Sequence, residues 1–175
     1  MTCPPVKRLL IVWWSMTGAT RQLAEAAAAG AREALDEAGE SAAVEVILRR
    51  ADQAGPDDVL GAAALLVATP ENLASMAGMM KDFFDRCWYP VLDRINGRPF
   101  AAIVCAGSDG QGSLRQLARF SAGWRLREVA DPLLVITGAQ TPEAILAPKT
   151  VDTAERARAA ELGATLAAGL ALGLW

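Results

Sequence analysis

Five short apolar runs recur along this chain of 175 residues and are separated by longer stretches with helical periodicity. Four of the runs are almost continuously apolar, which is typical of parallel strands that are covered on both faces of a sheet. The second run includes Glu45, and this favours a strand at the sheet edge. The five runs cover residues 9–14, 44–48, 63–68, 100–105 and 133–137.

The stretches between the runs predict helices. An apolar stripe from Leu23 to Ala38 is followed by Gly39, a typical helix terminator. Asp152 and Glu155 have the spacing of a capping box and predict the start of the last helix. Further helices are expected over residues 79–88 and 113–122, with a short turn or helix within 51–60.

Strands that alternate with helices predict a doubly wound parallel α/β sheet with helices on both faces, and we expect residues 1–175 to form one domain. Ligands of such sheets bind beyond the carboxyl ends of the strands. The loops most relevant to function therefore begin at Ser15, Thr69, Gly107 and Gly138.

Composition excludes several classes of function. The chain contains no histidine, which rules out Ser-His-Asp and Cys-His catalysis and imidazole-bound metals. Its formal charge of -3 does not indicate binding to nucleic acid or to an anionic membrane. Cys3, Cys87 and Cys105 are widely spaced, so we expect no disulfide framework, no metal site and a reducing cytoplasmic location. Cys87 and Cys105 lie on apolar patterns and are interpreted as small buried hydrophobes.

The C-terminal stretch of residues 162–175 is apolar around most of its circumference, yet too short to span a bilayer. Such a helix is covered by its own monomer or by a partner. We expect a homo-oligomer, with packing inside one monomer as the alternative. Trp88, Trp124 and Trp175 end helices that run away from the expected site, and we expect them to pack rather than to bind a ligand.

The loop after the first run is rich in hydroxyl groups and leads directly into a helix. The N–H groups at a helix start are unpaired and carry positive dipole, so they bind phosphate well. Three hydroxyl residues and Gly18 within six positions exceed what a simple helix cap needs, and they favour a phosphate held by neutral donors. Neither a Walker motif nor a GxGxxG fingerprint is present.

Three of these loops resemble the flavodoxin-like superfamily. Residues 15–20 match its flavin mononucleotide phosphate loop, S/T-x-T-G-x-T, at Ser15, Thr17, Gly18 and Thr20. Residues 69–86 are similar to the T-P-x-x-x-x-S/N-M-S-G-x-x-K-x-F-x-D segment of flavodoxin-like NAD(P)H:quinone oxidoreductases and FMN reductases. Residues 106–112 are similar to the glycine-containing loop after strand four in that group.

The resemblance implies a flavodoxin-like five-stranded sheet of order 2-1-3-4-5 that binds FMN. The FMN phosphate would be held by Ser15, Met16, Thr17, Gly18, Ala19 and Thr20. The isoalloxazine ring would be lined by Thr69, Pro70, Glu71, Asn72, Leu73, Ser75 and Met76, and closed on its other side by Gly107, Ser108, Asp109, Gly110 and Gly112.

Neither ring-side loop contains the aromatic residues that electron-transfer flavodoxins use to sandwich the flavin. An open ring face suits hydride delivery from a nicotinamide. We therefore expect an NAD(P)H-dependent oxidoreductase that reduces a quinone, flavin or similar small acceptor, and assign no side chain as a catalytic acid or base. The alternative is a flavodoxin-type electron-transfer protein that serves a redox protein partner.

Three basic residues are further candidates for attracting the phosphate of a nicotinamide nucleotide. These are Arg115 and Arg119, which share a helix face, and Lys149, in the long final loop. That loop contains Pro142 and Pro148 and has the length of a lid or an interface element.

Overall fold

The computed structural model describes residues 5–175, so Cys3 lies outside the described part of the chain. Its sheet is built on five parallel strands in the order β2-β1-β3-β5-β7. Counted along the chain, this is the predicted order 2-1-3-4-5, and β2 pairs only with β1, as expected of an edge strand. The bounds are Lys7–Trp13 for β1, Val44–Arg50 for β2, Ala64–Asn72 for β3, Pro99–Ala106 for β5 and Leu133–Ile136 for β7.

Two strands of two residues each extend the sheet. β4 (Ser75–Met76) pairs antiparallel with the end of β3 and makes a hairpin with it. β6 (Arg127–Glu128) lies beside the start of β5. Neither was predicted, because two residues carry no usable hydrophobic period.

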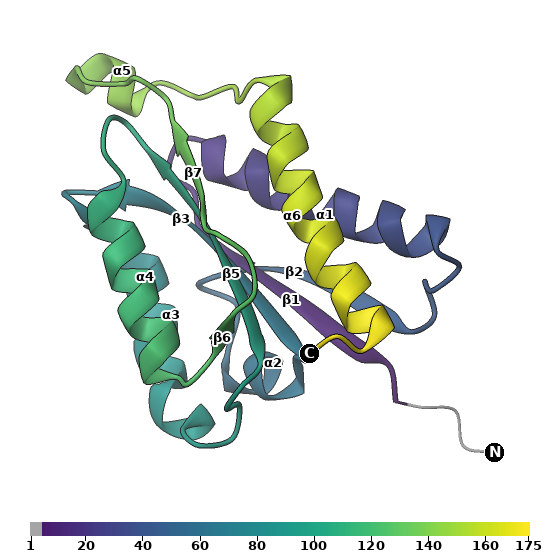
Figure 1. Cartoon of the computed structure of the whole chain (residues 1–175). Coiled ribbons are helices and arrows are strands. Elements are labelled where there is room, and N and C mark those ends of the chain that lie inside the picture. The colour runs from purple at the N-terminus through teal and green to yellow at the C-terminus, as the bar shows by residue number, and fades with distance from the viewer. Residues whose placement is uncertain (1–4) are drawn as a thin grey trace.

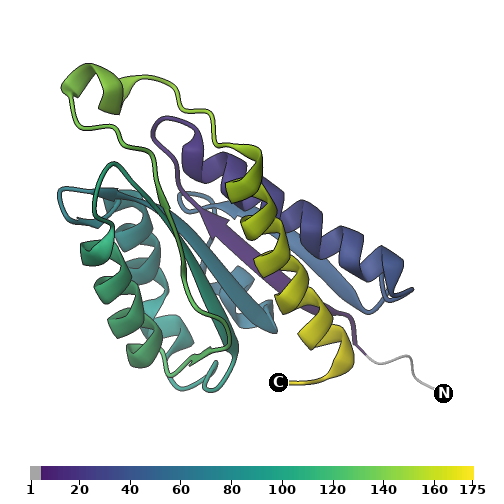
Figure 2. The ribbon, with the colours of Figure 1, turned by 45° about the horizontal axis from the view of Figure 1, so that its top comes forward.

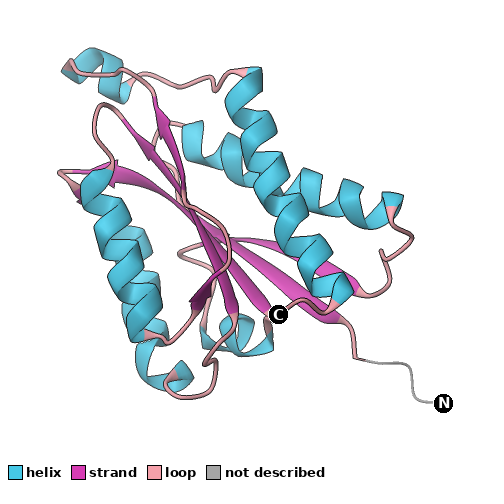
Figure 3. Ribbon diagram, in the orientation of Figure 1, coloured by secondary structure: helices cyan, strands magenta, loops and turns pink. Residues whose placement is uncertain are grey.

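Successive residues of the central strands feed two separate cores, because side chains alternate between the faces of a sheet. Leu9 and Ile11 of β1 join the core beneath α1 and α6, whereas Leu10 and Val12 join the core beneath α2, α3 and α4. Figures 1 and 3 show these two groups of helices on opposite faces of the sheet. The helices are α1 (Ala19–Glu37), α2 (Pro56–Gly61), α3 (Gly78–Val91), α4 (Gln111–Gly123), α5 (Pro142–Leu146) and α6 (Thr153–Leu172).

Most predicted helices are confirmed, with small shifts at their ends. α4 begins at Gln111 instead of 113, and the Asp152 side chain accepts the Glu155 N–H at the start of α6, as its spacing predicts. Trp88, Trp124 and Trp175 all pack against the two cores. None of the helices within residues 5–175 is both long and apolar enough to cross a membrane.

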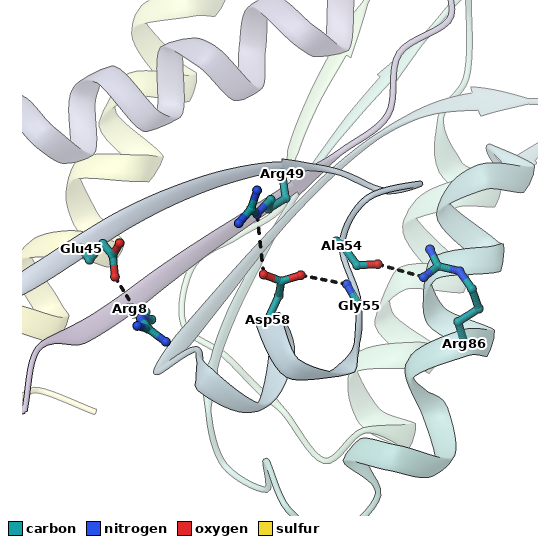
Figure 4. A network of polar contacts seen from close by, with 7 residues as sticks. All are labelled: Arg8, Glu45, Arg49, Ala54, Gly55, Asp58 and Arg86. Carbon is teal, nitrogen blue, oxygen red and sulfur yellow. Dashed lines mark hydrogen bonds and ion pairs between the residues drawn. The ribbon is translucent and has the colours of Figure 1, made fainter.

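Arginine side chains hold the segment between β2 and α2, one of them from the neighbouring helix α3 (Figure 4). Asp58 accepts the Gly55 N–H at 3.0 Å and lies 3.6 Å from the Arg49 guanidinium. From α3, Arg86 donates to the Ala54 carbonyl at 2.9 Å. The Ala54 carbonyl and the Gly55 N–H, which lie between β2 and α2, thus both have side-chain partners, as buried or half-buried backbone groups require.

The apolar C-terminal helix packs within its own chain. α6 lies across α1, and the two backbones touch at Gly30 and Gly163, where an added Cβ atom would overlap the carbonyls of Ala160 and Ala27. Trp175 returns onto Gly169 in the last turn. Intrachain packing therefore accounts for the apolar pattern, and a homo-oligomer stays a prediction.

Gly163→Ala tests this close approach. We expect the substitution to lower the free energy of unfolding by about 1–3 kcal/mol, because a methyl group must push α6 away from α1. Gly78→Ala is the matched control, since nothing lies within 4 Å of an added Cβ there. Urea denaturation should place the control within about 1 kcal/mol of wild type or above it. Equal stability of Gly163→Ala and wild type would contradict the packing described.

Candidate functional site

A cavity of about 400 Å³ lies at the carboxyl edge of the sheet, where the predicted loops meet. Its volume falls in the range of about 300–1,000 Å³ that is usual for small-molecule sites. The residues that line it come from the loops after β1, β3, β5 and β7. They are Ser15, Met16, Thr17, Ala19, Thr20, Pro70, Glu71, Asn72, Leu73, Ala74, Cys105, Ala106, Gly107, Ser108, Thr137, Ala139, Ile145 and Lys149.

Eleven of the eighteen residues predicted to bind a cofactor are among these lining residues. The other seven lie close by in sequence but outside the lining: Gly18, Thr69, Ser75, Met76, Asp109, Gly110 and Gly112. Most of these have visible structural roles. Met76 is buried in the core beneath α3, and the buried Thr69 hydroxyl accepts the Ala77 N–H at 3.2 Å. Ser75 donates its hydroxyl to Gln116 at 2.9 Å.

Seven lining residues are not among those predicted to bind FMN. Ala74, Cys105 and Ala106 border loops that were already assigned, whereas Thr137, Ala139, Ile145 and Lys149 come from the last loop. Of these, Lys149 was a candidate for attracting a nicotinamide phosphate, and the other residues of that loop form no motif that assigns them a role.

The start of α1 leaves backbone donors open at this cavity. Gly18 is the N-cap with φ 97°, and its N–H donates to the Ser15 hydroxyl at 3.0 Å. The first helical hydrogen bond is Gln22 N–H to the Gly18 carbonyl. Within residues 5–175, the N–H groups of residues 19–21 find no acceptor, and the first turn carries no acidic residue. Open donors and an uncompensated dipole are the features by which helix starts bind anions.

The start of α4 borders the same region, but a side chain already accepts its backbone N–H groups. Glu71, at the end of β3, accepts the Gly110 N–H at 2.8 Å and the Ser113 N–H at 2.9 Å. The carboxylate therefore supplies the negative charge that this helix start would otherwise attract. Glu71 is the only acidic residue among those that line the cavity, and its charge is directed to α4.

The β3–β4 hairpin forms one wall of the cavity and is held against α4 by hydrogen bonds and a close backbone contact. Leu73 and Ala74 occupy its two-residue turn with φ of 51° and 57°, a conformation that favours glycine or asparagine. The Gln116 side-chain carbonyl accepts the Met76 N–H at 2.8 Å, and Gly112 lets the Ala74 carbonyl come so close that a Cβ would overlap it. These contacts hold Leu73 fully exposed at the cavity rim.

The two cysteines in the described part of the chain, Cys87 and Cys105, are buried and have raised pKa values. Burial raises the pKa of the Cys105 thiol to about 11, against the opposing effects of a hydrogen bond with Thr20 and the positive charge of Lys149. Burial also raises the pKa of the Cys87 thiol to about 12. Both stay protonated at neutral pH, which confirms their interpretation as buried hydrophobes.

Comparisons with known proteins agree with this architecture. The family model described as NADPH-dependent FMN reductase matches residues 14–140. A flavodoxin of Aquifex aeolicus (strain VF5) is 32% identical over 106 residues, which make up 61% of this chain and 54% of that protein. The match thus spans about half the length of the curated relative.

Solved structures confirm the flavodoxin-like fold. A flavodoxin from the domain Archaea superimposes with a TM-score of 0.70 at 17% identity, and the match covers 93% of this chain and 98% of that one. A WrbA-like flavodoxin from Agrobacterium tumefaciens also gives a TM-score of 0.70 at 17% identity, covering 94% and 97%.

Replacing Glu71 tests the closed start of α4. We expect Glu71→Ala to lower the free energy of unfolding by about 0.5–2 kcal/mol, because two backbone N–H groups lose their acceptor. Asp109→Ala is the control, since Asp109 is exposed in the adjoining loop and has no side-chain hydrogen bond among the described residues. Its effect on urea denaturation should stay within about 0.5 kcal/mol. Equal losses in both variants would contradict the capping role.

Proposed function

This chain belongs to the NADPH-dependent FMN reductase family, and from that premise we propose that it binds FMN in the cavity and works as an NAD(P)H-dependent oxidoreductase. Its acceptor would be a quinone, a flavin or a similar small molecule. The open start of α1 carries the proposal, since it offers neutral donors to one phosphate at one end of the cavity.

The residues present fit an FMN phosphate. Residues 19–21 offer backbone N–H groups, and Thr17 lines the cavity next to them. The Ser15 hydroxyl oxygen already accepts the Gly18 N–H, which leaves its own O–H to donate. The one lining carboxylate, Glu71, is bonded to α4, so its charge is compensated there. These features stabilise a bound dianion through short charge-assisted hydrogen bonds.

Other residues of the lining fit a flat ring with polar edges. Pro70, Leu73, Ala106, Ala139 and Ile145 give it apolar walls, while Asn72 and Ser108 add polar side chains. When bound, FMN supplies hydride acceptance from a nicotinamide and electron transfer to the acceptor. The protein positions the ring and keeps its walls free of charge, apart from the compensated Glu71 and the half-buried Lys149.

Among residues 5–175, the side chains that line the cavity include no aromatic one. The walls therefore leave room over the ring for a nicotinamide and then for an acceptor at the same place. The chain has no histidine and its buried thiols stay protonated, so we assign no protein side chain to proton transfer.

An electron carrier is the second candidate. It is favoured by the Aquifex aeolicus relative, which is named a flavodoxin. Such a carrier would exchange single electrons with a protein partner and would not oxidise a nicotinamide.

Rapid mixing separates the two candidates. After loading with FMN and removal of free flavin, the protein should lose its flavin absorbance when mixed with NADPH or NADH. Dithionite is the control, since it shows that the bound flavin is reducible. Bleaching by dithionite but by neither nicotinamide would contradict the reductase and leave the carrier. Failure to retain any FMN would overturn both.

A further inference from the structure

Lys149 is attached by its backbone to the loop that is proposed to hold the phosphate. Its N–H donates to the Thr17 carbonyl at 2.8 Å, and its own carbonyl accepts the Gln22 side-chain amide at 2.7 Å. The same amide donates to the Gly18 carbonyl, and the Gln22 side-chain carbonyl accepts the Val151 N–H at 3.1 Å. Hydrogen bonds therefore join residues 149–151 to the loop before α1 and to its first turn.

Lys149 is also the only basic residue among those that line the cavity. A lysine carries its charge on a flexible four-carbon stem, and its backbone here adjoins Thr17 and Gly18. The start of α1 is thus within reach of the Lys149 ammonium. The positive charge of Lys149 acts on the Cys105 thiol in the cavity wall, which is consistent with this placement.

In the structure the Lys149 ammonium closes the carbonyl end of α5. It donates to the carbonyls of Ala144 at 2.5 Å, Ile145 at 3.0 Å and Ala147 at 2.6 Å. None of the residues of α5 is buried, and Figure 2 shows this helix set apart beyond the ends of the strands. Ile145 is the α5 residue that lines the cavity. With so little packing, the position of α5 depends on the contacts at its ends.

We propose that Lys149 is the cation of the phosphate subsite and that its ammonium bridges the bound phosphate and the carbonyl end of α5. An ammonium has three donors, so it can exchange one backbone carbonyl for a phosphate oxygen and keep the others. Phosphate binding then fixes α5, and with it Ile145 in the cavity lining. This inference rests on the proposed function, because it needs the FMN phosphate at α1.

Affinities for FMN and riboflavin, which lacks the phosphate, test the bridge. Lys149→Met should weaken FMN binding about 10-fold or more, the size expected for a lost hydrogen bond between charged groups, and leave riboflavin binding nearly unchanged. Lys149→Arg keeps the charge and should retain most of the FMN affinity. Lys81→Met is the matched control, because it removes the same charge from an exposed lysine that pairs with Asp85 on α3 and does not line the cavity.

A purely structural role would give a different result. If Lys149 only holds α5 in place, Lys149→Met weakens FMN and riboflavin by the same factor, and the proposal is overturned. No change in either affinity overturns it as well. Absence of FMN binding by the wild-type protein would instead refute the proposed function, so the two failures are distinguishable.

Amide hydrogen exchange of the wild-type protein tests the coupling to α5 without a variant. FMN should slow exchange over residues 142–149, and inorganic phosphate at high concentration should do so in part. Riboflavin should have a much smaller effect. Equal protection by FMN and riboflavin, or no protection by either, would contradict the bridge.

Discussion

Backbone N–H groups at the start of a helix need acceptors, and the parallel sheet brings several helix starts to one edge, among them those of α1 and α4. α1 follows β1 and α4 follows β5, so both direct positive dipole toward the loops that surround the cavity. Glu71 satisfies α4 from within the chain, whereas the N–H groups of residues 19–21 have no acceptor in the described part of it. Of these two helix starts, only that of α1 keeps open donors, and this is where we propose that a phosphate binds.

The hairpin wall of the cavity depends on the same carboxylate. By binding the start of α4, Glu71 fixes the end of β3, and Gln116 and Gly112 hold the hairpin that follows. Two non-glycine residues with positive φ are thereby kept in a conformation that costs each of them about 1–2 kcal/mol. Strain of this kind persists where surrounding contacts enforce it, often beside a ligand.

Sequence reasoning reached the parallel sheet because buried strands leave continuous apolar runs, and its strand order through the resemblance to the flavodoxin-like superfamily. It singled out the hydroxyl-rich loop because a helix cap needs fewer hydroxyls. It could not assign contacts between residues that are distant in sequence. Glu71 was predicted to line a flavin, and its pairing with α4 becomes visible only once β3 and α4 are neighbours. Lys149 likewise joins the phosphate loop through contacts 127 and 132 positions away, Gln22 and Thr17. The apolar pattern of α6 gave no sign that α1 would cover it, since small residues at the contact fit a partner helix equally well.

The central proposal is that the unpaired N–H groups at the start of α1 bind the phosphate, whereas those at the start of α4, which Glu71 accepts, do not. Amide chemical shifts, followed by two-dimensional nitrogen–proton NMR during titration with FMN and then with inorganic phosphate, test it residue by residue. The N–H signals of residues 19–21 should shift with both ligands, because hydrogen bonds to an anion displace amide proton resonances strongly. With inorganic phosphate the signals of Gly110 and Ser113 should stay in place, since Glu71 already occupies them. Shifts centred on Gly110 and Ser113, or no shift at residues 19–21 with either ligand, would contradict the account.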